Sequence, residues 1–490
     1  MPWLDLVEID SLEAHVLIDN DLDPMSTIAP DTVQVSGMMG HLAMDSPRHL
    51  DDRGDAHREL RMEDICCSAH GLSILLTATK GDQKHSVLFD AGPEEEAWER
   101  NVRRMRPDLS SVELVQLSHW HRDHSGGLPR AIRMINDAKE ANGRPKDLII
   151  DLHSNRPDFR GFAIGENIIS LQADPSFEEL EAAGATIQKN DNAHTVLDDF
   201  FLISGEIPRR TRYETGLKNG MRFDKKDDEW TSDEAIADER FIMCNIKDKG
   251  VVMLTGCSHA GVVNCAQHAL ELAGGSIPLH AVIGGFHLAT SDATQIESSI
   301  KDLLKLDPAV LLPGHCTGWR AKFAIEKRQP GMLVPCSAQE HRLYDIFSTC
   351  FEKGNPSSPN CVESNLFGSF RVNKTREPEH LKAVLTGNFA DFGKGERFYG
   401  CSRNLIRPMF IKCRISDLDI FERKIQTMLS VYSPSGEPTD VMDLLYRMTL
   451  ERYHRTSAWK GRQRSRNPTS RCRLGFCKVQ RIQTILAMTG

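Results

Sequence analysis

Short apolar segments alternate with polar, glycine-containing turns through residues 1–340, a pattern that predicts a mixed α/β domain. Apolar runs of strand length occur at residues 14–20, 71–77, 86–89, 112–117 and 147–152. The second and third runs predict a hairpin across residues 80–82, and residues 128–139 have the spacing of a helix. Two polar stretches, residues 21–64 and 203–238, predict surface loops, and the second loop could act as a lid.

Three further apolar runs each lead into a glycine-containing turn that carries one histidine. The runs are residues 250–254, 279–283 and 309–312, and the histidines that follow them are His259, His287 and His315. Consecutive strands that end at one edge of a sheet bring such side chains together. One of these histidines alone would be read as structural, but the repetition predicts a shared metal site.

Side chains that can bind metal ions are most concentrated in QLSHWHRDHSGGL at residues 116–128, which contains His119, His121, Asp123 and His124. Imidazole nitrogens and carboxylate oxygens suit zinc and similar divalent ions, and a short turn can present several of them. The alternative, that these are solvated loop residues, does not explain the concentration of ligand-type side chains. We therefore predict a metal site in which Asp123 is a catalytic residue, acting as ligand, base or both.

Four other residues are weaker candidates for substrate binding. His153 ends the strand predicted at residues 147–152, where a lone histidine is usually structural. Arg209, Arg210 and Arg212 lie in the polar stretch 203–238 and could bind an anionic substrate. A run of charges is, however, more often a solvated face.

Composition indicates a globular protein. The 490 residues are 40% hydrophobic and 26% charged with a net charge of −9, which argues against disorder throughout and against a general attraction to nucleic acid or anionic membranes. The acidic start and the lack of a long apolar run predict neither a secretory signal nor a membrane span. The 13 cysteines, without CxxC pairs, indicate reduced thiols and hence a cytoplasmic location.

The string HWHRDHSGG resembles the signature of the metallo-β-lactamase superfamily. That resemblance implies an α/β fold, the αββα metallo-β-lactamase sandwich, with a one- or two-metal site between its sheets. The strings HGLS, LTGCSHAGVVN, VIGGFHL and PGHCTG resemble the branch of the dihydropterin ribofuranosylaminobenzene phosphate synthases. The likeness covers residues 12–337.

The resemblance also implies ligand roles. The first metal ion would be held by His119, His121 and His259, and the second by Asp123, His124 and His315. Asp90, in LFDAG, resembles an aspartate behind the metal loop that orients a ligand histidine, with a turn-capping role as the alternative. Many members have a bridging aspartate where this chain has His287, so the number of metal ions, one or two, stays open.

The composition changes after Cys336. Residues 341–364, which include EKGNPSSP, predict a linker, and strings within residues 365–451 resemble the N-terminal part of fungal cytochromes P-450. The FxxGxRxCxG loop that holds haem iron in those enzymes does not occur in this sequence. We therefore predict a mostly α-helical, truncated segment without haem or monooxygenase function, then a basic, disordered tail at residues 452–490.

Together these features predict a metal-dependent hydrolase that acts on a small phosphorylated or heterocyclic substrate through metal-activated water. Zinc is favoured, with manganese and iron as alternatives. Two other functions stay open: a transferase like the synthase branch, and a non-catalytic binding or scaffold module. No nucleic-acid or membrane partner is predicted, and the sequence does not determine the oligomeric state.

Overall fold

The computed structural model describes residue 4 and residues 6–26, 33–46, 52–343, 361–366 and 370–375. The chain divides into two compact units, Met1–Ile346 and Phe347–Gly490. In the second unit, the described residues form one antiparallel hairpin, β20 (Cys361–Leu366) with β21 (Phe370–Thr375). This hairpin stands at the start of the segment predicted to be helical, and the rest of that segment and the basic tail lie outside the described residues.

One sheet of the first unit is eight-stranded. Its order is β10 (Thr186–Lys189), β7 (Ile149–Leu152), β6 (Val112–Gln116), β5 (Gln83–Phe89), β4 (Ser73–Lys80), β2 (Ser11–Ile18), β19 (Glu340–Arg342) and β3 (Gln34–Ser36). The strands from β10 to β5 are parallel, and the remaining pairs are antiparallel. The predicted β4–β5 hairpin is confirmed. The surface loop predicted at residues 21–64 is partly wrong, because it contains β3, α1 (Met39–Asp45) and η1 (Met62–Asp64).

The other sheet is seven-stranded. Its strands are β11 (His194–Val196), β12 (Phe201–Ile203), β15 (Ile242–Ile246), β16 (Gly250–Thr255), β17 (Leu279–Gly285) and β18 (Val310–Gly314), with β1 (Glu8–Ile9) beside β15. β16, β17 and β18 run parallel. Their carboxyl ends therefore meet at one edge of the sheet, as the sequence predicted.

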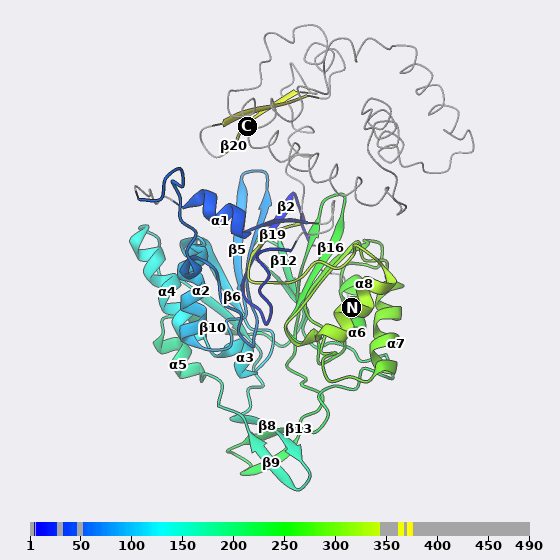
Figure 1. Cartoon of the computed structure of the whole chain (residues 1–490). Helices are drawn as coiled ribbons and strands as arrows, with labels where there is room; N and C mark the ends of the chain where they lie inside the picture. Colours follow the sequence, from blue (N-terminus) through cyan, green and yellow to red (C-terminus); the bar gives the residue numbers. More distant parts are fainter. Residues whose placement is uncertain are drawn as a thin grey trace, which may run out of the picture. The chain divides into compact units, whose positions relative to one another are not determined.

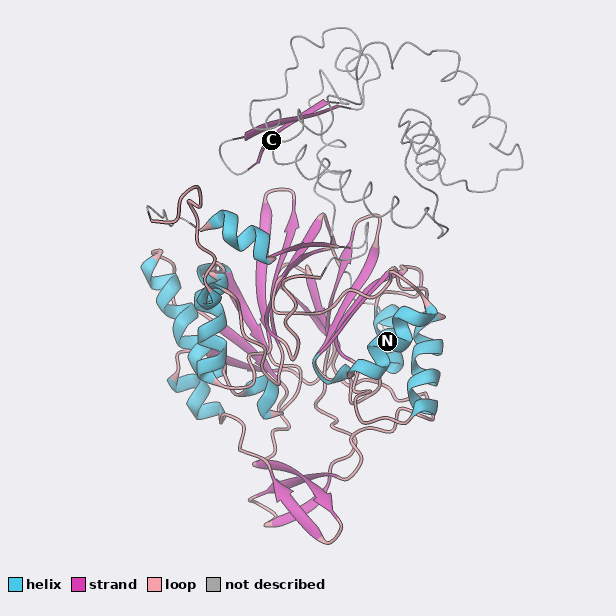
Figure 2. Cartoon of the chain, viewed as in Figure 1, coloured by secondary structure: helices cyan, strands magenta, loops and turns pink. Residues whose placement is uncertain are grey.

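The two sheets pack face to face with helices on both outer surfaces (Figure 1, Figure 2). The eight-stranded sheet is covered by α2 (Glu95–Met105), α4 (Leu128–Ala141) and α5 (Phe177–Ala182), and the other sheet by α6 (Val262–Leu272), α7 (Ala293–Leu304) and α8 (Trp319–Arg328). Strand alternation explains the layers, since Val87 and Phe89 join the core between the sheets whereas Leu88 packs under the helices. The predicted αββα sandwich is confirmed.

A small sheet extends from the sandwich (Figure 1). Its order is β14 (Glu229–Ser232), β13 (Gly220–Asp224), β8 (Phe159–Ile164) and β9 (Asn167–Ser170). The stretch 203–238, predicted to be a loop, thus contributes two strands. Aromatic side chains alternate with its charges, and Phe223 lies opposite Trp230 with ring centroids 5.5 Å apart, a cross-strand pair that stabilises a sheet.

No described helix has both the length and the apolar character needed to cross a lipid bilayer.

Candidate metal centre

The HWHRDH residues lie in a tight loop between β6 and α4 that includes α3 (Arg122–Ser125). The loop packs on the turn after β5 so closely that a Cβ atom on Gly92 would lie 1.6 Å from the carbonyl oxygen of Asp123. The neighbouring Ala91 N–H donates to the His124 carbonyl oxygen at 2.7 Å. Backbone contacts therefore fix the loop before any metal ligand is considered.

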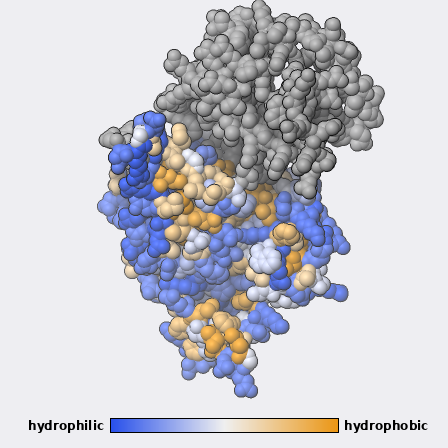
Figure 3. All heavy atoms as spheres, viewed as in Figure 1, coloured by the Kyte–Doolittle hydropathy of each residue, from blue (hydrophilic) through white to orange (hydrophobic). Residues whose placement is uncertain are grey.

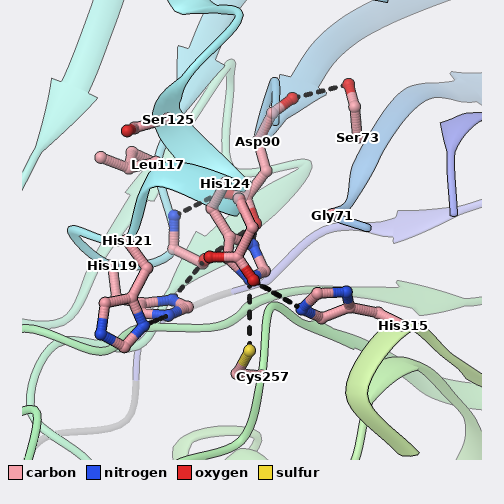
Figure 4. A network of polar contacts seen from close by, with 12 residues as sticks. Gly71, Ser73, Asp90, Leu117, His119, His121, His124, Ser125, Cys257 and His315 are labelled. Carbon is pink, nitrogen blue, oxygen red and sulfur yellow. Dashed lines mark hydrogen bonds and ion pairs between the residues drawn. The ribbon is translucent and has the colours of Figure 1, made fainter. Parts of the chain in front are cut away.

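Three buried imidazoles converge in the first cluster, which consists of His119, His121 and His259. His119 Nε2 lies 2.9 Å from His121 Nδ1 (Figure 4). His121 Nδ1 in turn lies 3.2 Å from His259 Nε2. Zinc–nitrogen bonds of about 2.0–2.1 Å in tetrahedral geometry place ligand nitrogens roughly 3.3 Å apart. The spacing of these nitrogens therefore fits a three-histidine metal position with one coordination site left open.

The protonation of this cluster suits a cation. Burial lowers the pKa of His119 and His259 well below the ordinary value and lowers that of His121 to about 3. All three imidazoles are therefore neutral near pH 7. Neutral imidazole is the form that binds metal ions.

A second cluster lies beside the first and contains Asp123, His124, Cys257 and His315. His124 Nε2 lies 3.2 Å from His315 Nε2 and 3.2 Å from Cys257 Sγ, and Asp123 Oδ2 lies 3.3 Å from His315 Nε2 (Figure 4). Burial acts to lower the pKa of His124, but the carboxylates of Asp90 and Asp123 outweigh it and raise this pKa to about 9. The two carboxylates thus favour a positive charge at His124, and a metal ion bound there would take the place of the imidazole proton.

Outer contacts orient several of these ligand histidines. Asp90 Oδ2 lies 2.7 Å from His124 Nδ1, and Ser118 Oγ lies 2.9 Å from His119 Nδ1. Asn20 Oδ1 lies 3.0 Å from His315 Nδ1. Such partners hold the ring and its tautomer in place for a ligand nitrogen on the opposite side. Asp90 therefore contacts a predicted ligand histidine, and its orienting role stays a prediction.

Backbone strain marks the same region. Asp90, Ser258, His287 and His315 adopt left-handed conformations with φ values of 58°, 60°, 48° and 45°. Non-glycine residues rarely adopt these angles, and such residues cluster at functional sites. The turns that carry the histidines are therefore held in costly conformations by the surrounding fold.

A buried ion network ties the small sheet to the metal loop. Arg160, in β8, donates to the Trp120 carbonyl oxygen at 2.6 Å and pairs with Asp238, whose carboxylate also accepts the Trp120 N–H at 2.8 Å. Trp120 stands between His119 and His121 in the sequence. Both polar backbone groups of this residue are thus held by side chains outside the loop.

A cavity of about 760 Å³ opens onto the clusters. Its polar lining includes Asp123, His287, Lys218 and Lys322, and Phe162, Ile164, Leu171 and Leu217 form an apolar wall from the small sheet and its flanking loops. Figure 3 shows hydrophobic residues gathered on this small sheet. Ile164 of β8 is 60% exposed. The combination suits a small ligand with an apolar part and an anionic part.

The predicted substrate-binding residues do not line this cavity. Arg209 donates to the carbonyl oxygen of His259 at 3.2 Å, Arg210 pairs with Glu271 of α6, and Arg212 is exposed. The carbonyl oxygen of His153 accepts a hydrogen bond from Trp120 Nε1. Arg209 and His153 thus contact the metal-site loops, not the cavity.

Sequence reasoning missed several residues of the site, namely Asn20, His70, Lys218, Cys257, Cys316 and Lys322. Cys257 and Cys316 each stand within two positions of a predicted ligand, in GCSH and GHCT. That adjacency was the available signal. His287 is a member of neither histidine cluster but groups with these two cysteines, and its ring centroid lies 4.3 Å from that of His259.

Comparison with known proteins finds a relative of the N-terminal half of the chain. No family model matches the chain. It is 28% identical over 266 residues to a 7,8-dihydropterin-6-methyl-4-(β-D-ribofuranosyl)-aminobenzene-5'-phosphate synthase of Methanocaldococcus jannaschii, covering 52% of this chain and 83% of that protein. The N-terminal half of the chain is a homologue of this synthase. The homology and the ligand clusters together indicate a metal-binding enzyme.

Two further similarities accompany the synthase homology. A solved metal-dependent hydrolase of the β-lactamase superfamily aligns with 68% of this chain and 99% of its own, at 23% identity and a TM-score of 0.46. A cytochrome P450 monooxygenase of Talaromyces variabilis is 31% identical over 146 residues, 23% of this chain. The chain spans only 27% of the length of that monooxygenase, so its likeness to cytochromes P450 is confined to a fragment.

Proposed function

We propose that the N-terminal unit is a metal-dependent hydrolase of a small anionic substrate. The observation that carries this proposal is the pair of adjacent buried ligand clusters at the floor of the cavity. Imidazole-rich positions favour zinc over magnesium or calcium, with manganese and iron as alternatives. A divalent ion bound there would lower the pKa of a water molecule towards about 7 and polarise the scissile bond.

The residues of the two clusters would have different roles in this reaction. His119, His121 and His259 would form one metal position, and Asp123, with its side chain 24% exposed to the cavity, could bind an ion or accept a proton. Burial acts to raise the pKa of Asp123, but His124 and His315 outweigh it and hold this pKa well below the ordinary value. The carboxylate is therefore ionised, which suits metal binding, whereas its low pKa makes it a weak general base.

Substrate class follows from the cavity. Lys218 and Lys322 supply positive charge, the latter paired with Asp21, and the small sheet supplies the apolar wall. A small molecule with a phosphate or carboxylate beside a ring would meet both surfaces. We propose no nucleic-acid or membrane partner. A cytoplasmic location agrees with the free thiols of the described cysteines.

The test is the double substitution His121→Ala, Asp123→Ala. We expect loss of bound metal, measured by plasma emission spectrometry, and loss of chelator-sensitive turnover in a screen of phosphodiester, lactone and thioester substrates. Metal content that stays at the wild-type level would contradict the assignment. Wild-type protein that binds metal but turns over none of these substrates would favour the binding or scaffold alternative.

A synthase-like transferase is the second candidate, and the homology to the M. jannaschii synthase favours it. The two chemistries differ in their products, because a hydrolase adds water to the substrate whereas a transferase joins two substrate fragments. Mass spectrometry of reactions in water enriched in ¹⁸O separates them. Incorporation of the label into product supports hydrolysis.

A further inference from the structure

The second ligand cluster contains a sulfur atom that the ligand pattern read from the sequence did not include. Cys257 lies in the turn after β16, is 3% exposed, and lines the cavity. Its Sγ lies within 4.8 Å of the ligand atoms of Asp123, His124 and His315. Resting on the metal-dependent function proposed above, we propose that Cys257 is the fourth protein ligand of this metal position.

The surroundings of Cys257 differ from those of an ordinary buried cysteine. Cys244 and Cys265 pack inside apolar core clusters, as free cysteines usually do. Cys257 belongs to none of the core clusters and instead faces ring nitrogens and the sulfur-bearing residue Cys316. An apolar packing role therefore does not account for its position.

The contacts of Cys257 bring it into one set with two histidines. His124 Nδ1 is engaged by Asp90, and the opposite ring nitrogen, His124 Nε2, is equally close, at 3.2 Å, to Cys257 Sγ and to His315 Nε2. Three atoms that can bind a metal ion therefore lie next to one another. Zinc–sulfur bonds of about 2.3 Å and zinc–nitrogen bonds of about 2.0–2.1 Å place tetrahedral ligand atoms roughly 3.3–3.6 Å apart. The contacts of 3.2 Å are close to this spacing.

A fourth protein ligand has two consequences. This metal position would be closed, so the open coordination site would belong to the three-histidine position. A thiolate also selects soft or borderline ions, which favours zinc over manganese at the second position. Imidazole and carboxylate ligands alone leave the identity of the metal ion open. The Cys257 thiolate would then restrict it.

Cys316 provides the matched control. It follows His315 in the sequence and groups with Cys257 and His287, but it does not belong to the cluster of Asp123, His124 and His315. Cys257→Ser and Cys316→Ser each remove one thiol from the same cavity wall. Only the first change removes the proposed ligand.

The experiment replaces the native ion with Co²⁺ and records the thiolate-to-cobalt charge-transfer band in the near ultraviolet. We expect this band in the wild-type protein and in Cys316→Ser, and its loss in Cys257→Ser with the visible cobalt bands of the three-histidine position retained. X-ray absorption of the wild-type zinc protein should show a sulfur neighbour at about 2.3 Å, a measurement that requires no variant to fold.

The outcomes separate this proposal from the proposed function. Wild-type protein that binds cobalt or zinc without a sulfur signature would overturn the role of Cys257 and leave a metal-dependent enzyme. A charge-transfer band that persists in Cys257→Ser, or disappears only in Cys316→Ser, would do the same. Wild-type protein that binds no metal ion would refute the function itself.

Discussion

Asp90 offers the sharpest test of how the metal centre is held. The carboxylate is fully buried and accepts three hydrogen bonds, from the Ser118 N–H at 2.7 Å, from Ser118 Oγ at 2.8 Å, and from His124 Nδ1 at 2.7 Å. Asp90→Asn keeps the size of the side chain. Asparagine also tolerates the left-handed backbone, where φ is 58°. The substitution therefore changes the polar contacts without adding backbone strain.

The magnitude follows from these contacts. An amide has one acceptor oxygen, so at least one of the three donors must face the amide NH₂ group. A buried donor without an acceptor costs about 1–3 kcal/mol of stability. Loss of an outer partner of a metal-binding histidine typically weakens metal affinity by about 10–100-fold. We expect both effects in Asp90→Asn.

The assay compares metal affinity, by competition with a chromophoric chelator, with urea unfolding of the metal-free protein. Asp151→Asn is the matched control, because Asp151 is equally buried but contacts Arg240, Asn190 and His194. That variant should lose stability and keep its metal affinity. Wild-type metal affinity in Asp90→Asn, or an equal loss in the control, would refute the orienting role of Asp90.

Two further predictions concern the metal loop and the C-terminal segment. Gly92→Ala should displace the loop, because the new Cβ would lie 2.6 Å from the His124 nitrogen as well as against Asp123. We expect a loss of about 1–3 kcal/mol and reduced metal content, and a variant that keeps both values would contradict the packing argument. The full-length chain should show no Soret absorbance on reduction with carbon monoxide, and a haem-loaded protein would make it a two-enzyme fusion.

The sandwich could be predicted because buried strands leave a strong signal. Residues 250–254 and 279–283 are almost wholly apolar, and parallel strands covered on both faces require such runs. The same topology makes it predictable that His259 and His315 lie at one edge of the sheet, since the parallel strands β16 and β18 both end there. Pattern and topology together therefore predicted most of the ligand clusters.

The remaining features depend on contacts that spacing does not encode. Cys257 and Cys316 stand in turns of different strands, and no CxxC pattern marks them. The small sheet was missed because charged residues alternate with Phe223 and Trp230 and made this stretch resemble a loop. The cationic side chains that line the cavity are Lys218 and Lys322. The arginines predicted from the sequence, Arg209, Arg210 and Arg212, do not line it. The missed cysteines and lysines reflect tertiary neighbours, whereas the missed strands of the small sheet reflect a wrong local prediction.

Arg160 leads to a pH-dependent prediction. It is 3% exposed and pairs with both Asp233 and Asp238. Burial acts to raise the pKa of Asp238, but the Arg160 guanidinium outweighs it and holds this pKa below the ordinary value. The wild-type contribution of Asp238 to stability is therefore present near neutral pH and is lost as the pH falls through its folded-state pKa.

Arg160→Met should reverse that dependence. Without the guanidinium, burial alone would raise the pKa of Asp238, and the unpaired carboxylate should cost about 3–5 kcal/mol near pH 8. Protonation removes the buried charge, so the deficit relative to wild type should be smaller at pH 5. Urea unfolding of both metal-free proteins at the two pH values measures this difference. Adding Asp238→Asn should recover part of the loss at pH 8, and a deficit unaffected by pH or by that second change would contradict the ion-pair argument.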